Sequence, residues 1–231
     1  MERYSKILEK QQREIVLLRG SGCAYRKCTF CDYHLDKCAD QDANFALNRQ
    51  VLETVTGEFG DLEVINSGSV FELDTRTLAL IRDICRRKEI SVLHFESHYL
   101  YRNQIPALRQ EFSGLKLKMK LGLETFDYDF RENILKKGIR EHDPGIISRH
   151  FEEANFLFGI RGQTLASMER DISLGLAYFQ RICVNIMCDN STPVRPDREV
   201  ISLFVKELYP KYKDNERIDI LINNTDFGVG D

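Results

Sequence analysis

Short apolar runs recur along the chain and are separated by longer amphipathic stretches. The runs are rich in Val, Ile, Leu and Phe and are about five residues long, which is typical of strands buried on both faces of a parallel sheet. Six runs have this pattern and a seventh is a possible final or edge strand. They fall at residues 14–18, 62–66, 91–96, 117–123, 155–160, 182–187 and 218–222.

The amphipathic stretches between these runs predict helices. Asp74, Thr164 and Asp197 are suitable N-caps for helices that bury one apolar face. Leu165, Met168 and Ile172 illustrate the helical spacing that follows such a cap. The other predicted helical segments are a polar lead-in at 1–13, helices at 45–59, 74–88 and 99–112, and two short helices between 128 and 153.

Strands that alternate with helices imply a parallel sheet with right-handed crossovers. Six such units favour an α/β fold, a partial (β/α)6 TIM-type barrel, over a complete eight-unit barrel. An open doubly wound sheet is the alternative. We expect residues 1–231 to form a single domain, with chemistry at the C-terminal ends of the strands.

Composition narrows the class of protein. The 231 residues are 42% hydrophobic and 30% charged, as in an ordinary globular protein, and the net charge of −3 gives no general attraction to nucleic acid. The charged first ten residues do not predict a signal peptide, and no apolar run is long enough to span a membrane. We therefore expect a cytoplasmic protein whose seven cysteines are reduced.

Three of these cysteines stand close together directly after the first predicted strand. Cys23, Cys28 and Cys31 form a C-x4-C-x2-C pattern in a glycine-bearing loop at 20–38. Three thiolates on a four-iron cluster would leave one iron open to a ligand. Two alternatives stay open. Cys38 could join the three cysteines as the fourth ligand of a structural zinc site, or the cysteines could be ordinary small buried residues.

Polar side chains follow nearly every predicted strand at the same end. In a barrel these ends meet at one face, so the groups are candidates for a common site. The candidates are Cys23, Cys28 and Cys31, then Asn66, Ser67 and Gly68, then Glu96 and His98, then Glu124, Arg161, Asp189, Asn190 and Asn224.

The cysteine pattern, with Phe30 before its last cysteine, resembles the cluster loop of the radical S-adenosylmethionine (radical-SAM) superfamily. The commonest spacing in that superfamily has three residues in the first gap, whereas this chain has four. The resemblance implies a radical-SAM core, a [4Fe–4S] cluster held by the three cysteines, and S-adenosyl-L-methionine (SAM) at the open iron. It also implies SAM contacts for Asn66, Ser67 and Gly68, for Glu124 of the Gly-Leu-Glu-Thr segment, and for Phe30 near the adenine.

The short length and these motifs resemble the small radical-SAM lyases of queuine salvage. That resemblance implies release of the base queuine from queuosine 5′-phosphate, and an electron donor such as flavodoxin or ferredoxin. Acidic and amide groups could read a guanine-like edge, and arginines could bind a phosphate. We assign these substrate roles to Glu96, His98, Arg161, Asp189, Asn190 and Asn224, with Arg102 and Arg195 as further phosphate candidates. Another nucleotide-modifying radical-SAM enzyme and a zinc-bound, non-catalytic binding protein are the alternatives.

Overall fold

The computed structural model describes residues 2–223, and these divide into two compact units. The first unit contains the residues up to Arg26 together with Tyr33–Met119. The second contains Lys27–Asp32 and the chain from Lys120 onward. The prediction that residues 1–231 form one domain stays a prediction, and each unit is described by itself.

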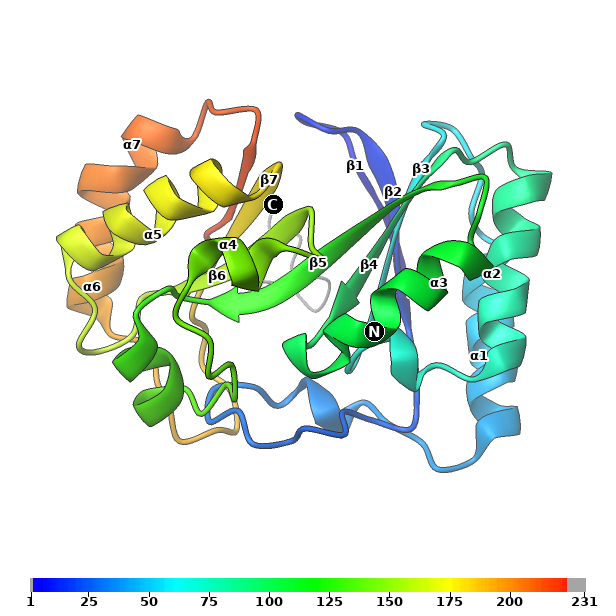
Figure 1. The fold of residues 1–231 in the computed structure, drawn as a ribbon, viewed down its shortest axis with the longest axis horizontal. Coiled ribbons are helices and arrows are strands. Elements are labelled where there is room, and N and C mark those ends of the chain that lie inside the picture. Colours follow the sequence, from blue (N-terminus) through cyan, green and yellow to red (C-terminus); the bar gives the residue numbers. More distant parts are fainter. Residues whose placement is uncertain (1, 224–231) are drawn as a thin grey trace. The chain divides into compact units, whose positions relative to one another are not determined.

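The first unit is built on a mixed sheet of four strands. β1 (Tyr4–Ile7) pairs antiparallel with β2 (Arg13–Leu18), which pairs parallel with β3 (Asp61–Asn66), and β3 pairs parallel with β4 (Val92–Ser97). Helices α1 (Gln41–Leu52) and α2 (Thr75–Arg87) contact each other in this unit (Figure 1). Its shorter helical segments are η1 (Tyr33–Leu35), η2 (Val70–Glu72), η3 (Tyr99–Gln104) and α3 (Ile105–Glu111).

Strand β5 (Lys116–Glu124) carries the chain from the first unit into the second. There β5, β6 (Glu153–Phe158), β7 (Arg181–Ile186) and β8 (Ile218–Leu221) pair in parallel, in chain order. Helix α5 (Leu165–Tyr178) packs against β6 and β7. The other helical segments of this unit are the π-helical η4 (Phe130–Ile134), α4 (Pro144–Ser148), α6 (Arg198–Leu203), the π-helical η5 (Phe204–Leu208) and α7 (Tyr209–Tyr212).

The seven predicted strands are all present, because apolar runs leave few alternatives once they are buried. The strand residues Leu62, Leu93 and Phe156 are fully shielded from solvent. The predicted caps Asp74 and Thr164 also begin α2 and α5 as expected, each side chain accepting backbone N–H hydrogen bonds of the first turn.

Two local predictions are wrong. The predicted helical lead-in at 1–13 contains strand β1, in which the Tyr4 hydroxyl donates to Glu14 Oε1 over 2.7 Å. Pairing with β2 outweighs the helical preference of its charged residues. The helix predicted at 45–59 runs instead from Gln41 to Leu52, because Asp40 accepts from Asp42 N and Ala43 N and starts the helix earlier.

The helix predicted at 99–112 divides into η3 and α3. Pro106 lies at the start of α3, where its missing N–H and fixed φ are tolerated. Among the described residues, no helix is long and apolar enough to span a membrane.

Candidate active site at the strand ends

The cysteine loop follows β2 and its base is closed by main-chain contacts. Cys38 N donates to Gly20 O over 3.3 Å, beside an isolated bridge between Gly20 and Lys37. Within the described residues, Cys23, Cys28 and Cys31 form no disulfide, and all three are partly accessible to solvent. These contacts close the base of the loop within the first unit, which contains Cys23, whereas Cys28 and Cys31 belong to the second unit. No three potential ligands among His, Cys, Asp and Glu are already gathered into a metal site in residues 2–223.

Glu72 holds the Cys23 turn in the first unit. Its Oε1 accepts from Ala24 N over 2.6 Å and from the Tyr101 hydroxyl over 3.0 Å, while Oε2 accepts from Ser69 N over 2.6 Å. Burial and the Glu72 charge raise the pKa of Tyr101 above its usual range. Sequence reasoning missed Glu72, which lies in a short helical turn rather than directly at a strand end.

The turn of Asn66, Ser67 and Gly68, which is predicted to contact SAM, lies beside Cys23. A Cβ on Gly68 would come within 1.9 Å of Glu72 Oε2 and 3.2 Å of Cys23 Cα, so only glycine fits. Asn66 Nδ2 donates to Ser69 O over 3.0 Å, and the Ser67 hydroxyl donates to Asp36 O. In this structure the Asn66 and Ser67 side chains shape the turn, and the predicted contacts with SAM stay predictions.

His98 also comes to the cysteine loop, whereas Glu96 remains a half-buried residue of β4. The His98 ring stacks on Tyr25, with centroids 4.4 Å apart. The ring Nδ1 accepts from Leu100 N over 3.1 Å, and the main-chain N–H of His98 donates to Ser69 Oγ over 2.8 Å. The first unit thus gathers Tyr25, Ser69 and His98 around the Cys23 side of the loop.

In the second unit Glu124 ends β5 and forms a buried ion pair. Lys137 Nζ lies 2.8 Å from Glu124 Oε1, and each side chain is 9% exposed. The ammonium group lies 5.3 Å from the centre of the Phe30 ring, within cation–π distance. The structure therefore brings together two predicted residues, Glu124 and Phe30, around a lysine that the sequence did not indicate.

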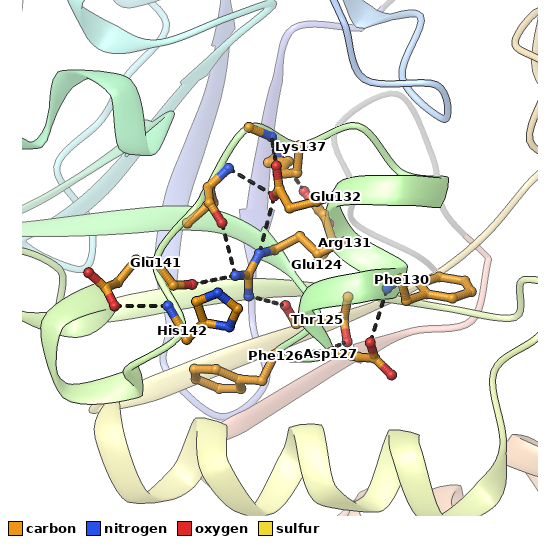
Figure 2. Close-up of polar contacts among 12 residues, drawn as sticks. Glu124, Thr125, Phe126, Asp127, Phe130, Arg131, Glu132, Lys137, Glu141 and His142 are labelled. Atoms are coloured by element: carbon orange, nitrogen blue, oxygen red, sulfur yellow. Dashed lines mark hydrogen bonds and ion pairs between the residues drawn. The ribbon is translucent and has the colours of Figure 1, made fainter.

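A fully buried arginine supports the segment that carries Lys137. Arg131 donates to the carbonyl oxygens of Thr125, Ile139 and Glu141 over 3.1, 2.9 and 2.6 Å (Figure 2). Burial lowers the pKa of Arg131, although Glu132 opposes that change. The three carbonyl contacts join the end of β5 to the irregular chain on both sides of Lys137.

The loop after β7 is bound to the cysteine loop. Asn190 Nδ2 donates to Phe30 O over 2.7 Å, and Asp32 Oδ2 accepts from both the N–H and the hydroxyl of Ser191 over 3.0 Å. Asn190 Oδ1 accepts from Thr192. The Asn190 side chain is therefore engaged in loop structure, while Asp189 is exposed. The predicted residue Asn224 lies outside the described residues.

An arginine-bearing cavity of about 660 Å³ lies beside this loop in the second unit. Its lining includes Arg161, which follows β6, and Arg195 and Arg198, which follow β7. The cavity adjoins the cysteine loop, because Thr29 donates to the carbonyl oxygen of Ile134 and accepts from Val194 N, and both of these residues line it. Arg102 belongs to the first unit, where its guanidinium lies over the Tyr99 ring.

The donor set and its surroundings suit an iron–sulfur cluster. Three cysteines lie on one loop, and in the second unit the ammonium of Lys137 lies 5.3 Å from the ring of Phe30, the residue before Cys31. A three-cysteine set leaves one iron without a protein ligand.

The structural comparison covers the whole chain. A queuine lyase from Clostridium spiroforme bound to SAM and queuine is 44% identical, with a TM-score of 0.95 and 100% of both chains covered. Streptococcus suis SuiB bound to S-adenosylmethionine shares the fold at 14% identity and a TM-score of 0.58, over 89% of this chain and 49% of its own. No protein-family model and no curated protein matches the chain.

Fold and cysteine loop together define a radical-SAM enzyme, and the predicted partial (β/α)6 barrel is confirmed. Within that class, the chain belongs to the queuine lyase family. Membership of this enzyme family excludes the alternative of a zinc-bound, non-catalytic binding protein.

Proposed function

We propose that this protein is a radical-SAM lyase that releases queuine from queuosine 5′-phosphate. The observation that carries the proposal is the full-length match at 44% identity to a queuine lyase bound to SAM and queuine. The three cysteines of the loop at 20–38 supply the ligand set that such an enzyme needs.

Cys23, Cys28 and Cys31 would hold a [4Fe–4S] cluster, and SAM would bind beside it. Together these cofactors supply one-electron cleavage of SAM and a radical that abstracts a hydrogen atom from the substrate. The protein must bind both molecules, exclude water and orient one C–H bond.

The residues around the loop divide this work. Gly68 lets the Glu72 carboxylate approach the backbone beside Cys23, and Asn66 and Ser67 shape this turn, which we assign to SAM. Glu124 offers a carboxylate acceptor to the ribose or ammonium group of SAM, and Phe30 offers an apolar face to the adenine. The Asn190 contact with Phe30 fixes the loop at this point.

The arginine-bearing cavity is suited to the 5′-phosphate of the substrate. Three guanidinium groups outnumber the two carboxylates of Asp197 and Glu199 in its lining. Arg161 is 93% exposed and only loosely paired with Asp197 over 3.5 Å, so it can turn towards an anion. Guanidinium groups bind phosphate oxygens in pairs of charge-assisted hydrogen bonds.

Recognition of the base needs acceptors for the N–H groups of a guanine-like edge. Glu96 and Asp189 can provide carboxylates, and His98 provides a ring beside Tyr25. Asn190 contributes to the site through the loop, and Asn224 stays a proposed substrate residue. Flavodoxin or ferredoxin would supply the electron in the cytoplasm, and no polymeric nucleic acid is required.

The test is anaerobic reconstitution with iron and sulfide, followed by reductant, SAM and queuosine 5′-phosphate. We expect about four irons per chain, formation of 5′-deoxyadenosine and release of queuine, all lost in Cys28→Ala. Arg161→Ala should raise the KM for queuosine 5′-phosphate and leave cleavage of SAM without substrate unchanged. SAM cleavage without queuine release would refute the lyase assignment and retain the radical-SAM class.

A further inference from the structure

The ion pair between Glu124 and Lys137 is buried at the end of β5. Its burial removes two charges from water, which costs free energy. Such a pair is favourable only when its geometry is good and its other hydrogen-bonding groups are satisfied. The 2.8 Å separation meets the first condition. A pair of apolar residues would fill the same space with no desolvation cost, so this position calls for an explanation in terms of charge.

The backbone around Glu124 is built to present the pair. Glu124 has φ of 73°, in the left-handed region that side chains seldom occupy, and the register of β5 against β6 shifts between Gly122 and Glu124. A Cβ on Gly122 would lie 3.0 Å from Lys137 Nζ and 3.2 Å from Glu124 Oε1. Glycine therefore provides the room in which the ammonium meets the carboxylate.

The segment that carries Lys137 is held in place by contacts of its main chain and by apolar packing. Its N–H donates to Arg131 O over 3.1 Å, and Arg131 in turn binds the carbonyl oxygens on both sides. Two residues before Lys137, the buried Leu135 packs in an apolar cluster against which Phe30 also packs. The segment is thus positioned relative to both Glu124 and the cysteine loop.

The buried carboxylate of Glu124 favours the charged form of Lys137. Burial acts to lower its pKa, but the charges of Glu124, Cys28 and Cys31 outweigh burial and raise the pKa above the usual range. The ammonium group therefore serves to hold the Glu124 carboxylate, 2.8 Å away.

We propose that Lys137 is a positioning residue, which holds the Glu124 carboxylate for SAM and places a positive charge beside Phe30, the neighbour in sequence of the proposed cluster ligand Cys31. This inference rests on the proposed radical-SAM function and assigns a role to a residue outside the cysteine loop. Loss of the charge should loosen SAM and make the cluster harder to reduce, because a nearby cation stabilises the more negative, reduced state.

The experiment compares Lys137→Met with Lys136→Met in anaerobically reconstituted holoenzyme. Both variants lose one positive charge, but the Lys136 side chain is exposed. We expect Lys137→Met to bind SAM at least tenfold more weakly, with a midpoint potential of the cluster shifted to a more negative value. Lys136→Met should match the wild type in both measurements. Wild-type SAM affinity and potential in Lys137→Met, at equal iron content, would overturn the proposal.

Two further variants keep the test decisive if Lys137→Met loads little iron. Lys137→Arg keeps the charge and should keep the wild-type potential, so a shifted potential in that variant would overturn the electrostatic role. Gly122→Ala crowds the pair without changing the net charge and should weaken SAM binding; unchanged affinity would overturn the positioning role. Failure of the wild-type protein itself to bind a cluster or cleave SAM would instead refute the proposed function.

Discussion

Glu72 Oε1 accepts a hydrogen bond from Ala24 N over 2.6 Å, and this contact ties the residue after Cys23 to the turn after β3. The same carboxylate accepts from Ser69 N. One side chain therefore sets the distance between the Cys23 turn and the turn expected to meet SAM. Because Glu72 accepts two main-chain N–H groups, its replacement affects the backbone of both turns.

Replacing Glu72 by Gln should weaken cluster retention. Gln keeps the length of the side chain but has only one acceptor oxygen, so its NH2 group would face one of the two backbone N–H groups. One charge-assisted hydrogen bond, worth about 2 kcal/mol, is therefore lost. We expect faster loss of iron to a chelator with little change in secondary structure. Glu53→Gln is the matched control, since Glu53 forms an exposed pair with Arg87. Equal rates of iron loss in the wild type and Glu72→Gln would refute this role.

Replacing Asn190 by Asp separates a loop role from a substrate role. Asp keeps the Oδ1 acceptor for Thr192, but the donor to Phe30 O is replaced by an oxygen, which should cost about 2 kcal/mol. We expect increased iron loss and weaker SAM binding, measured by chelation and equilibrium dialysis. A raised KM for queuosine 5′-phosphate, with iron and SAM binding unchanged, would instead make Asn190 a substrate residue.

Sequence patterns predict those parts of the site that are close to strand ends. Glu124 is the last residue of β5 and is therefore visible from the pattern of the strand alone. Lys137 lies 2.8 Å from it in space, but thirteen positions later in an irregular segment. The course of the chain around Lys137 depends on Arg131, which binds three carbonyl oxygens. No periodic pattern in the sequence predicts these contacts.

In the fold, too, some elements follow from the sequence pattern and others depend on tertiary contacts. The seven apolar runs give the strands because burial on both faces demands them. β1 is polar and short, and it is a strand only because β2 offers it an open edge. No local signal in residues 1–13 distinguishes that pairing from a polar helix.

Arg131 should prove essential to the segment between β5 and α4. Arg131→Met leaves the carbonyl oxygens of Thr125, Ile139 and Glu141 without this donor, and we expect the free energy of unfolding to fall by about 3 kcal/mol. Denaturant unfolding measures this loss, and limited proteolysis should show new cleavage between residues 125 and 142. Arg140→Met, at an exposed position, is the control. Wild-type stability in Arg131→Met would show that the buried guanidinium contributes little.

Asp171 should give the protein a measurable pH dependence of stability. Its Oδ1 accepts from Phe126 N over 2.8 Å, and burial raises its pKa to about 6 from the ordinary 3.8. Because the folded state holds the proton more tightly than the unfolded state, this residue reduces stability as the pH rises from about 4 to about 6. Above that range the reduction is constant, at about 3 kcal/mol for a shift of this size.

Asp171→Asn removes the titration and keeps an acceptor for Phe126 N. We expect the variant to be more stable than the wild type at pH 7.5 by about 1–3 kcal/mol. The difference should shrink towards pH 4, where the wild-type carboxyl is protonated and resembles the amide. Urea unfolding of both proteins across this range measures the difference directly and cancels the titration of the other carboxylates. A difference in stability that does not change with pH would show that Asp171 has the same pKa in the folded and unfolded states.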